Sequence, residues 1–502
     1  MTNYQGQWLK LSPVAIIYFA VQFVKDVGNN LIYLLPAILV GYNQFSENGL
    51  AIISGLAALL LFVLISALLK FYFYQYRLTD GRVQIHSGVF QKNHIDLPFE
   101  RIQNVRFEQP IFYRPSNHVC MLLDTAGSSK LEAKIIALSK GVAESLKQEI
   151  LSHKTEQASS AETESTETEQ EQLLNSRSVQ DLVIHGLASN RIWIVLGALA
   201  PFFNSLSEKF IAGIENLGVD VDALMASSQY AFWQYVLFFL SIAFVVIAFM
   251  ALISILGSVI TFYDFKLTRS NDRYIRRNGF FTRHEVVMKL SRLQMIVYQQ
   301  NWLDRILQRV NLKFEQLGAS LDRQSAGTSG GKIMVPSVTL GEANDLASDA
   351  WPENKLSAIN YHPVSKRLAI RNTLIAFWLL IPLAIAFIYF DQAEFSVAAG
   401  GLFILTTGLV ILSWKRWGYA MDEQFIYIRK GLIGVNYRCF PIHKVQQTQL
   451  HQSWFMRRFQ LCSVRLVLAC GGQTLPFIKR ATGEKYIDTC LYQVEALRKS
   501  WM

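Results

Sequence analysis

The chain has 502 residues, of which 51% are hydrophobic and only 17% are charged. Soluble domains usually carry about 25% charged residues, so this composition argues against an ordinary soluble protein and indicates a membrane protein with polar parts. The net charge of +10 suits an acidic partner, either an anionic membrane surface or a nucleic acid, and the long apolar segments favour the membrane.

Two apolar segments open the chain. Residues 13–45 are apolar but are interrupted by Lys25 and Asp26, so we expect an interfacial helix followed by a first membrane span at 28–45. One long tilted helix is the alternative. The second span, Ala51 to Leu69, contains no charged residue and runs into an aromatic segment, as expected at a membrane–water boundary.

A β-rich segment occupies residues 71–153. Its short runs of Val, Ile and Leu are separated by turns, beginning with Asp80-Gly81, which is typical of an all-β module. Gly141 to Leu151 then has helical periodicity. Residues 154–176 are rich in Glu, Ser, Thr and Gln and lack the apolar residues needed for packing, so we expect a disordered acidic linker.

The same order of segments then recurs twice. Further spans are expected at Ile192–Leu206, Gln229–Tyr263, 372–390 and 396–413. The predicted fold is an α-helical membrane protein with six helices in three pairs, each pair followed by a β module. The predicted domains are the helix pairs at 1–70, 177–263 and 351–413, and the modules at 71–153, 264–350 and 414–502.

One ungapped pattern occurs in all three modules. A glycine is followed after 13 residues by a basic residue, after two more by a glutamine, and after eleven more by an arginine. The three copies are Gly88, Arg101, Gln103 and Arg114; Gly279, Arg292, Gln294 and Arg305; and Gly431, Lys444, Gln446 and Arg457. This spacing indicates an internal repeat of one small domain. The basic residue and the glutamine either serve local strand geometry or form a polar site in each module.

The helix pairs and this motif resemble the bacterial pleckstrin-homology (PH) membrane proteins of the YdbS/YdbT type, and three modules with six spans are most similar to the YdbT form. The resemblance implies a seven-stranded, partly open β-barrel capped by a C-terminal helix in each module. It also implies a partner, a smaller membrane protein of the YdbS type with one module. The chain departs from the pattern at Ile111, where the other copies have Trp, and in a Ser/Gly-rich tip at Ala319 to Gly331.

Tryptophan and arginine residues gather in the turn that follows the repeated glutamine. These residues are Trp302 and Arg305 in the second copy, and Trp454, Arg457 and Arg458 in the third. An indole ring suits the headgroup level of a membrane and a guanidinium group binds phosphate, so this turn is a candidate membrane contact. Alternatively, the tryptophan packs into the core of its module.

Basic residues also flank the repeated glycine. They are Arg273, Arg276, Arg277 and Arg283 in the second copy, and Arg429 and Lys430 in the third. An anionic leaflet attracts each nearby cation by roughly 1 kcal/mol, which makes these residues candidate lipid or partner contacts. Alternatively, the charges keep an exposed strand edge from pairing with another chain.

The sequence contains no recognisable catalytic or metal-binding motif. It has no GxSxG, HExxH or P-loop, and its five cysteines form no CxxC or Cys/His cluster. The second to sixth spans have no central charged residue, whereas ion-coupled transporters usually keep such residues at mid-membrane. We therefore expect no catalytic, cofactor-binding or metal-binding residues, and cysteines that remain reduced.

These observations together predict a non-enzymatic protein of the bacterial inner (cytoplasmic) membrane. Its modules would form a docking platform for a membrane protein, for anionic lipid headgroups, or for both, in envelope homeostasis or stress resistance. The alternative is a transport or lipid-moving component whose helices form the path. A nucleic-acid partner is not expected, because the basic residues are spread over three modules without clustered aromatics.

The topology is directly testable. The three expected external loops are net acidic, and cytoplasmic loops of membrane proteins carry the excess of Lys and Arg, so all modules and both termini should be cytoplasmic. Reporter fusions after Leu151, Val338 and Met502 should read cytoplasmic, and a fusion within Ser207–Ser228 should read external. A module found outside the cell would contradict this orientation.

Overall fold

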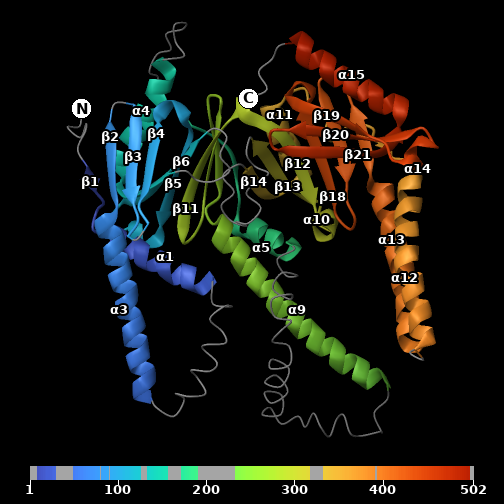
Figure 1. Ribbon diagram of the computed structural model, residues 1–502, viewed down its shortest axis with the longest axis horizontal. Coiled ribbons are helices and arrows are strands. Elements are labelled where there is room, and N and C mark those ends of the chain that lie inside the picture. Colours follow the sequence, from blue (N-terminus) through green and yellow to red (C-terminus); the bar gives the residue numbers. More distant parts are fainter. Residues whose placement is uncertain are drawn as a thin grey trace. The chain divides into compact units, whose positions relative to one another are not determined.

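A computed structural model describes nine segments of the chain (Figure 1), namely residues 8–29, 49–79, 81–89, 91–125, 133–156, 171–189, 232–316, 332–390 and 393–497. The chain divides into two compact units. Unit 1 contains residues 1–173 and 268–289, and unit 2 contains residues 174–267 and 290–502. Each unit is described by itself.

Within the described residues, each repeat contributes seven strands and a closing helix, as the PH-like expectation requires. Module 1 consists of β1 (Leu9–Lys10), β2 (Gln75–Thr79), β3 (Arg82–Ser87), β4 (Asn93–Pro98), β5 (Ile102–Pro110), β6 (His118–Thr125), β7 (Ala133–Ser139) and α4 (Lys140–Glu156). Module 2 consists of β8 (Gln172–Ser176), β9 (Lys266–Ser270), β10 (Arg273–Asn278), β11 (Thr282–Lys289), β12 (Leu293–Gln300), α10 (Trp302–Ile306), β13 (Arg309–Gln316), β14 (Lys332–Thr339) and α11 (Leu340–Ala350). Module 3 consists of β15 (His362–Pro363), β16 (Gly418–Met421), β17 (Phe425–Lys430), β18 (Val435–Pro441), β19 (Val445–His451), α14 (Trp454–Arg457), β20 (Leu461–Leu468), β21 (Gly471–Lys479) and α15 (Arg480–Leu497).

The first strand of each module precedes the membrane helices instead of following them. Leu9 of β1 faces Tyr76 of β2, and His362 of β15 faces Tyr419 of β16. β8 occupies the same position beside β9. The predicted modules at 71–153, 264–350 and 414–502 are therefore each one strand too short. The predicted linker at 154–176 likewise loses its two ends, one to α4 and the other to β8.

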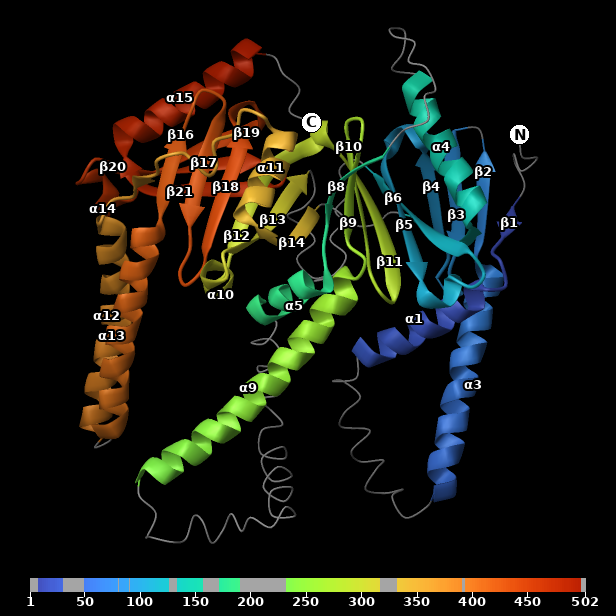
Figure 2. The ribbon, with the colours of Figure 1, turned by 180° about the vertical axis from the view of Figure 1, so that it is seen from behind.

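The helices that precede or link these strands are α1 (Ala15–Asn29), α3 (Gly49–Phe73), α5 (Val179–Ala188), α9 (Phe232–Phe262), α12 (Arg367–Tyr389) and α13 (Ala393–Arg416). Among the described residues, Phe244–Phe262, Arg367–Tyr389 and Phe395–Arg416 are long and apolar enough to cross a membrane. α12 and α13 lie side by side in both views (Figures 1 and 2).

Six spans remain a prediction. The second expected span corresponds to α3, of which Leu60–Phe73 is described as a shorter apolar helix. The expected spans at 28–45 and Ile192–Leu206 lie almost wholly or wholly outside the described residues, as does the tip at Ala319 to Gly331. α1 lies in the region assigned to the interfacial helix, and the choice between two helices and one long helix falls on residues 30–48, outside the described part.

Neighbouring modules share sheets through antiparallel strand pairs. In unit 1, β11 of module 2 pairs with β5 of module 1, giving the sheet order β7-β6-β5-β11-β10-β9-β8. The chain passes between the units within β8, within β9 and directly after β11. In unit 2, β18 of module 3 pairs with β12 of module 2 in the sheet β14-β13-β12-β18-β17-β16-β15. The sheets β1-β2-β3-β4 and β19-β20-β21 remain separate.

The core of module 1 fills the space between its two sheets and its helices. Val83 and Ile85 of β3, Met121 of β6 and Ile135 of β7 are fully buried there, and Phe19 of α1 joins them. In module 3 a corresponding core includes the cysteines Cys462, Cys470 and Cys490. All five cysteines are buried free thiols, and burial raises the pKa of each, which keeps them protonated and unreactive.

The repeated glycine forms the hairpin turn between the third and fourth strands of each module. Gly88 and Gly279 have φ angles of +106° and +118°, which side chains of L-residues rarely adopt. A Cβ atom at Gly279 would lie 2.0 Å from the carbonyl oxygen of Thr282, and one at Gly431 would lie 1.9 Å from that of Gly434. The turn therefore explains why all three copies carry glycine.

Replacing Gly279 with alanine should destabilise the protein. The positive φ angle and the contact with Thr282 strain the backbone, and such strain costs about 1–3 kcal/mol. The thermal unfolding midpoint of detergent-purified protein should therefore fall. The matched control is Gly341→Ala in the first turn of α11, where an added Cβ meets nothing within 4 Å. This control should keep or raise the midpoint, because alanine favours helix over glycine. Equal midpoints for the two variants would contradict the interpretation of the turn.

Candidate functional site

The repeated basic residue ends a short 3-10 turn between the fourth and fifth strands, at Phe99–Arg101, Leu290–Arg292 and Ile442–Lys444. Lys444 is buried, and its ammonium group donates to the carbonyl oxygens of Ser291 at 2.7 Å and Leu293 at 2.6 Å. These carbonyls belong to the preceding module. Lys444 therefore fastens module 3 to the strand β12 with which β18 pairs.

The repeated glutamine has no common environment. Gln294 is buried on β12, whereas Gln446 is exposed on β19. Gln103 lies on β5, and its side chain is outside the described part of the structure. Arg101 is exposed and Arg292 is half-buried, with a pKa lowered by burial. The basic residue and the glutamine therefore do not build the same polar site in every module.

Arg114 also serves a joint between modules. Its guanidinium group donates to the carbonyl oxygen of Gly279 at 3.5 Å and to that of Phe280. Both acceptors belong to the hairpin turn of module 2 that lies within unit 1. The first and last positions of the repeated pattern thus meet at one joint.

The structure separates the four arginines of the second hairpin. Arg276 is buried, and burial, with Arg106 nearby, lowers its pKa to about 10. Arg277 makes a bidentate ion pair with Glu171 at 2.5 and 2.8 Å and contacts Glu285 at 3.1 Å. Burial makes Arg276 unavailable to a lipid headgroup, which corrects its candidacy as a lipid contact. Arg277 is 41% exposed but is already paired with two carboxylates.

The remaining hairpin residues are partly or fully accessible. Arg273 is half-buried on β10, and Arg283 is exposed on β11. In module 3, Arg429 lies over the ring of Tyr361 at 5.1 Å, and Lys430 lies 6.0 Å from the ring of Trp417. Burial, with Arg438 nearby, lowers the pKa of Lys430 to about 8.

The turn after the fifth strand contacts the first helix of its own module in every repeat. Tyr113 of module 1 stacks on Tyr18 of α1 at 6.3 Å between ring centroids. In module 2, the Asn301 amide donates to the Ala188 carbonyl of α5 at 2.7 Å. In module 3, Arg367 at the start of α12 lies 3.1 Å from the centroid of the Phe459 ring.

This turn also carries exposed aromatic and basic side chains. They are Trp302 and Arg305 on α10, and Trp454, Arg457 and Arg458 on and just after α14. Trp302 is 53% exposed and Trp454 is 79% exposed, so neither ring packs into the core of its module. The alternative expectation, a core tryptophan, is therefore wrong for both. α12 meets module 3 at this turn, so Trp454 lies close to one end of a membrane-length helix.

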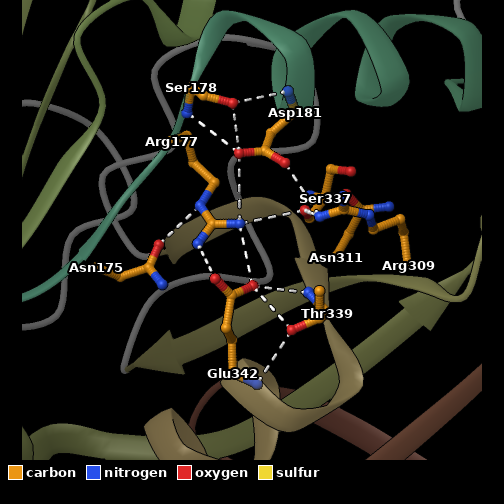
Figure 3. Close-up of polar contacts among 9 residues, drawn as sticks. All are labelled: Asn175, Arg177, Ser178, Asp181, Arg309, Asn311, Ser337, Thr339 and Glu342. Carbon is orange, nitrogen blue, oxygen red and sulfur yellow. Dashed lines mark hydrogen bonds and ion pairs between the residues drawn. The ribbon is translucent and has the colours of Figure 1, made fainter.

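A buried polar cluster in unit 2 joins α5 to module 2 (Figure 3). Arg177, whose side chain is 3% exposed, donates to both carboxylate oxygens of Glu342 at 2.7 and 3.2 Å, to Asn175 at 2.8 Å and to the Ser337 carbonyl at 3.3 Å. Burial tends to raise the pKa of Glu342, but hydrogen bonds from Arg177 and Thr339 outweigh it, so the pKa is lowered.

Two helix caps share this cluster. Glu342 caps α11 together with Thr339, and Asp181 caps α5 together with Ser178. Asp181 also accepts a hydrogen bond from Arg309 of β13 at 3.0 Å. Because each carboxylate serves a cap and a guanidinium group, the N-termini of α5 and α11 are held in one network, as Figure 3 shows.

α5 is in turn packed tightly against α9. The hydroxyl groups of Ser254 and Ser258 on α9 donate to the carbonyl oxygens of Gly186 at 2.7 Å and Leu182 at 2.8 Å. A Cβ at Gly186 would lie 2.5 Å from the Cα of Ile255, so the two backbones meet at a position that only glycine allows. The polar cluster and this contact together connect module 2 to a membrane-length helix.

The repeat and the basic segments of the sequence do not single out Arg177, Asp181, Arg309 or Glu342. Their signal is present in the segments Ser178-x-x-Asp181 and Thr339-x-x-Glu342, which both match the capping-box pattern. The partners of those caps could not be read, since Arg177 and Glu342 lie 165 residues apart. Within the described residues, no group of three or more His, Cys, Asp or Glu side chains could hold a metal ion.

Comparison with known families agrees with this geometry. The family model described as "Bacterial PH domain" matches residues 29–154, 223–349 and 373–494. The chain belongs to the bacterial PH domain family. This confirms the resemblance drawn from the repeated motif, and the three matches coincide with the three repeats.

A relative that matches over nearly its whole length supports the same family assignment. The chain is 20% identical over 495 residues to the "UPF0699 transmembrane protein YdbT" of Bacillus subtilis (strain 168), covering 95% of this chain and 96% of the relative. No solved structure matches the chain. With its membrane-length helices, the chain is a membrane protein that carries bacterial PH domains.

Replacing Arg177 with methionine should loosen α5 from module 2. The loss should be about 2 kcal/mol, less than the roughly 3–5 kcal/mol for a fully buried pair, because the Glu342 side chain is 39% exposed. The thermal unfolding midpoint at pH 7 should fall. Because the pKa of Glu342 is lowered in the folded state, this stabilisation is lost as the pH falls through that pKa, and the difference should shrink in acid.

The control for this variant is Arg480→Met. Arg480 forms an exposed pair with Glu484 four residues later on α15, at 2.7 Å. Exposed pairs contribute little to stability, so this variant should unfold close to the wild-type temperature. A control that destabilises as much as Arg177→Met would show that the cluster has no special role.

Proposed function

We propose that this protein is a non-enzymatic docking platform of the bacterial inner membrane. Its PH-like modules and both termini would lie in the cytoplasm, where they bind anionic lipid headgroups and a membrane protein partner, in envelope homeostasis or stress resistance. The proposed binding of lipid headgroups is based on the turn after the fifth strand. In modules 2 and 3 it exposes tryptophan and arginine while contacting a helix next to, or within, the membrane-spanning part.

The chemistry of that turn supports a headgroup contact. A tryptophan ring is favoured at the membrane–water interface, and a guanidinium group binds phosphate through two parallel hydrogen bonds. Arg457 at the end of α14 and Arg458 just after it are exposed near Trp454. The turn therefore offers both an aromatic anchor and two cations at the end of α12, which suits an anionic leaflet.

The shared sheets support a protein partner of the same family. Within each unit, one module already recognises another through an edge strand, β5 with β11 and β12 with β18. A membrane protein with a single PH module, of the YdbS type, would carry the same kind of strands. We propose such a protein as a partner, and the modules need no catalytic residue for this role.

The lipid contact can be tested on the full-length protein in nanodiscs. Trp454→Cys is labelled with an environment-sensitive fluorophore, and the five native cysteines, being buried, remain unlabelled. Emission should shift to the blue in discs containing phosphatidylglycerol, but not in neutral phosphatidylcholine discs. Rising salt should reverse the shift. Adding Arg457→Gln and Arg458→Gln should weaken the contact by up to about 2 kcal/mol.

The matched control removes two charges elsewhere in the same module. Arg465→Gln on β20 and Lys485→Gln on α15 are exposed substitutions away from the turn. This pair should leave the lipid-dependent shift in place. A shift that is absent in anionic discs, or that both pairs abolish equally, would reject a specific headgroup contact at this turn.

A further inference from the structure

The two joints between modules use one register. In unit 1, Glu285 of β11 faces Phe107 of β5, and in unit 2, Tyr437 of β18 faces Tyr298 of β12. Positions can be counted from the repeated glycine of each module. In each joint, the residue six positions after this glycine faces the residue nineteen positions after the repeated glycine of the preceding module. The fourth strand of one module and the fifth strand of the module before it are therefore a matched pair of edges.

Among the described strands, one edge of each type has no matching partner. β4 is the fourth strand of the first module, and no described module precedes it. β19 is the fifth strand of the last module, and no described module follows it. Within the described part of the chain, the sheet β1-β2-β3-β4 ends at β4 and the sheet β19-β20-β21 begins at β19, so neither edge has a strand beside it.

The burial of side chains differs between β19 and β12, the fifth strands of modules 3 and 2, as expected if β19 has no neighbouring module. All residues from Leu293 to Tyr298 on β12 are buried, but on β19 only Val445 is. Tyr298 is 3% exposed, whereas Leu450 at the same position of the repeat is 39% exposed. On β4, Asn93, His94 and Asp96 are exposed.

β19 also lacks the usual protection of an edge strand. Its sequence from Val445 to His451 contains no lysine, glutamate, aspartate or proline, and it is seven residues long. Proteins normally blunt such an edge with charges, proline or a bulge at its centre. The ladder of β19 with β20 has one irregularity, between Val445 and Gln447, which leaves the rest of the edge regular.

A second feature of the joint recurs at the β4 end. Lys444, at the end of the turn between β18 and β19, fastens module 3 to backbone carbonyls of the preceding module. Arg101 has the same place in module 1 and is exposed. The first module thus presents both the edge strand and the cation that the other joint uses.

We infer that a second copy of this chain docks its β19 onto β4, in the register of the two internal joints. His94 then faces Leu450, and Asp96 faces Thr448. The occupant is a second copy because both complementary edges occur on this one chain. The contact is heterologous, so copies add head to tail in a row or close into a ring. This inference rests on the proposed docking function and adds a second copy of the chain to the partner proposed above.

Both copies are held in one membrane, which favours this contact. The internal joint between β12 and β18 already connects modules that are each attached to membrane-length helices, α9 for module 2 and α12 with α13 for module 3. Pairing of these strands is therefore compatible with helices that enter the same membrane. A second copy would meet the first with the same geometry.

Cysteine cross-linking between two tagged copies tests the register. One copy carries His94→Cys and the other carries Leu450→Cys, each with a different tag, and both are co-expressed at full length. Opposed residues of antiparallel strands have Cβ atoms about 4.5–5.5 Å apart, within reach of a disulfide or a short methanethiosulfonate linker. Oxidised membranes should give a reducible band with both tags, at twice the 57.1 kDa of one chain.

The off-register control pairs His94→Cys with Gln446→Cys. Position 446 lies on the same strand as 450 but is four residues away, roughly 13 Å along the strand. Its cross-linked band should be at least tenfold weaker. Equal bands, or no band from variants that unfold at the wild-type temperature, would overturn the inference.

Two further outcomes would also overturn it. A dimer formed by His94→Cys alone would mean that β4 pairs with β4, and a band of another mass would mean that a different protein occupies the edge. Neither outcome depends on the fluorescence shift at position 454. A failed cross-link with an intact lipid-dependent shift therefore rejects docking of a second copy and leaves the proposed lipid contact standing.

Discussion

The need to pair backbone groups along strand edges shapes both units of this protein. An unpaired edge leaves a row of N–H and C=O groups without partners, and buried groups of this kind are costly. β11 satisfies the edge of β5, and β18 satisfies that of β12. Lys444 adds a buried ammonium group to the second joint. The repeats are therefore parts of continuous sheets and are not structurally independent domains.

The position of the membrane helices within each module follows from the same pairing. Because β1, β8 and β15 precede the helices while β2, β9 and β16 follow them, each helical segment leaves and re-enters one sheet. Two connections fix a module to its helices more firmly than a single linker would. In module 2, the cluster around Arg177 and the close contact of Gly186 with α9 strengthen that attachment. The result is a module held close to the end of its helices.

Positive charge in the sequence does not translate directly into a membrane-binding surface. Arg276 is buried in the sheet, and Arg277 is neutralised by Glu171, which lies 106 residues away in the chain. Arg283 of the same hairpin stays exposed, and the turn after the fifth strand exposes Trp454 and Arg458. Local composition marks both groups of arginines equally, and only their partners distinguish them.

The sequence by itself determined the threefold repeat, the β modules with their closing helices, and the glycine turn. These features depend on local spacing and periodicity, as at Gly88, Gly279 and Gly431. The same local patterns were enough to indicate the family and the membrane character of the protein. The tertiary structure alone decided that β1, β8 and β15 belong to the modules and that β5 pairs with β11. The alternation of side chains along a strand specifies which face is buried. The hydrogen bonds between strands are made by backbone groups that all residues share, so the sequence of a strand does not specify which strand pairs with it. Strands as short as Leu9–Lys10 carry no pattern at all.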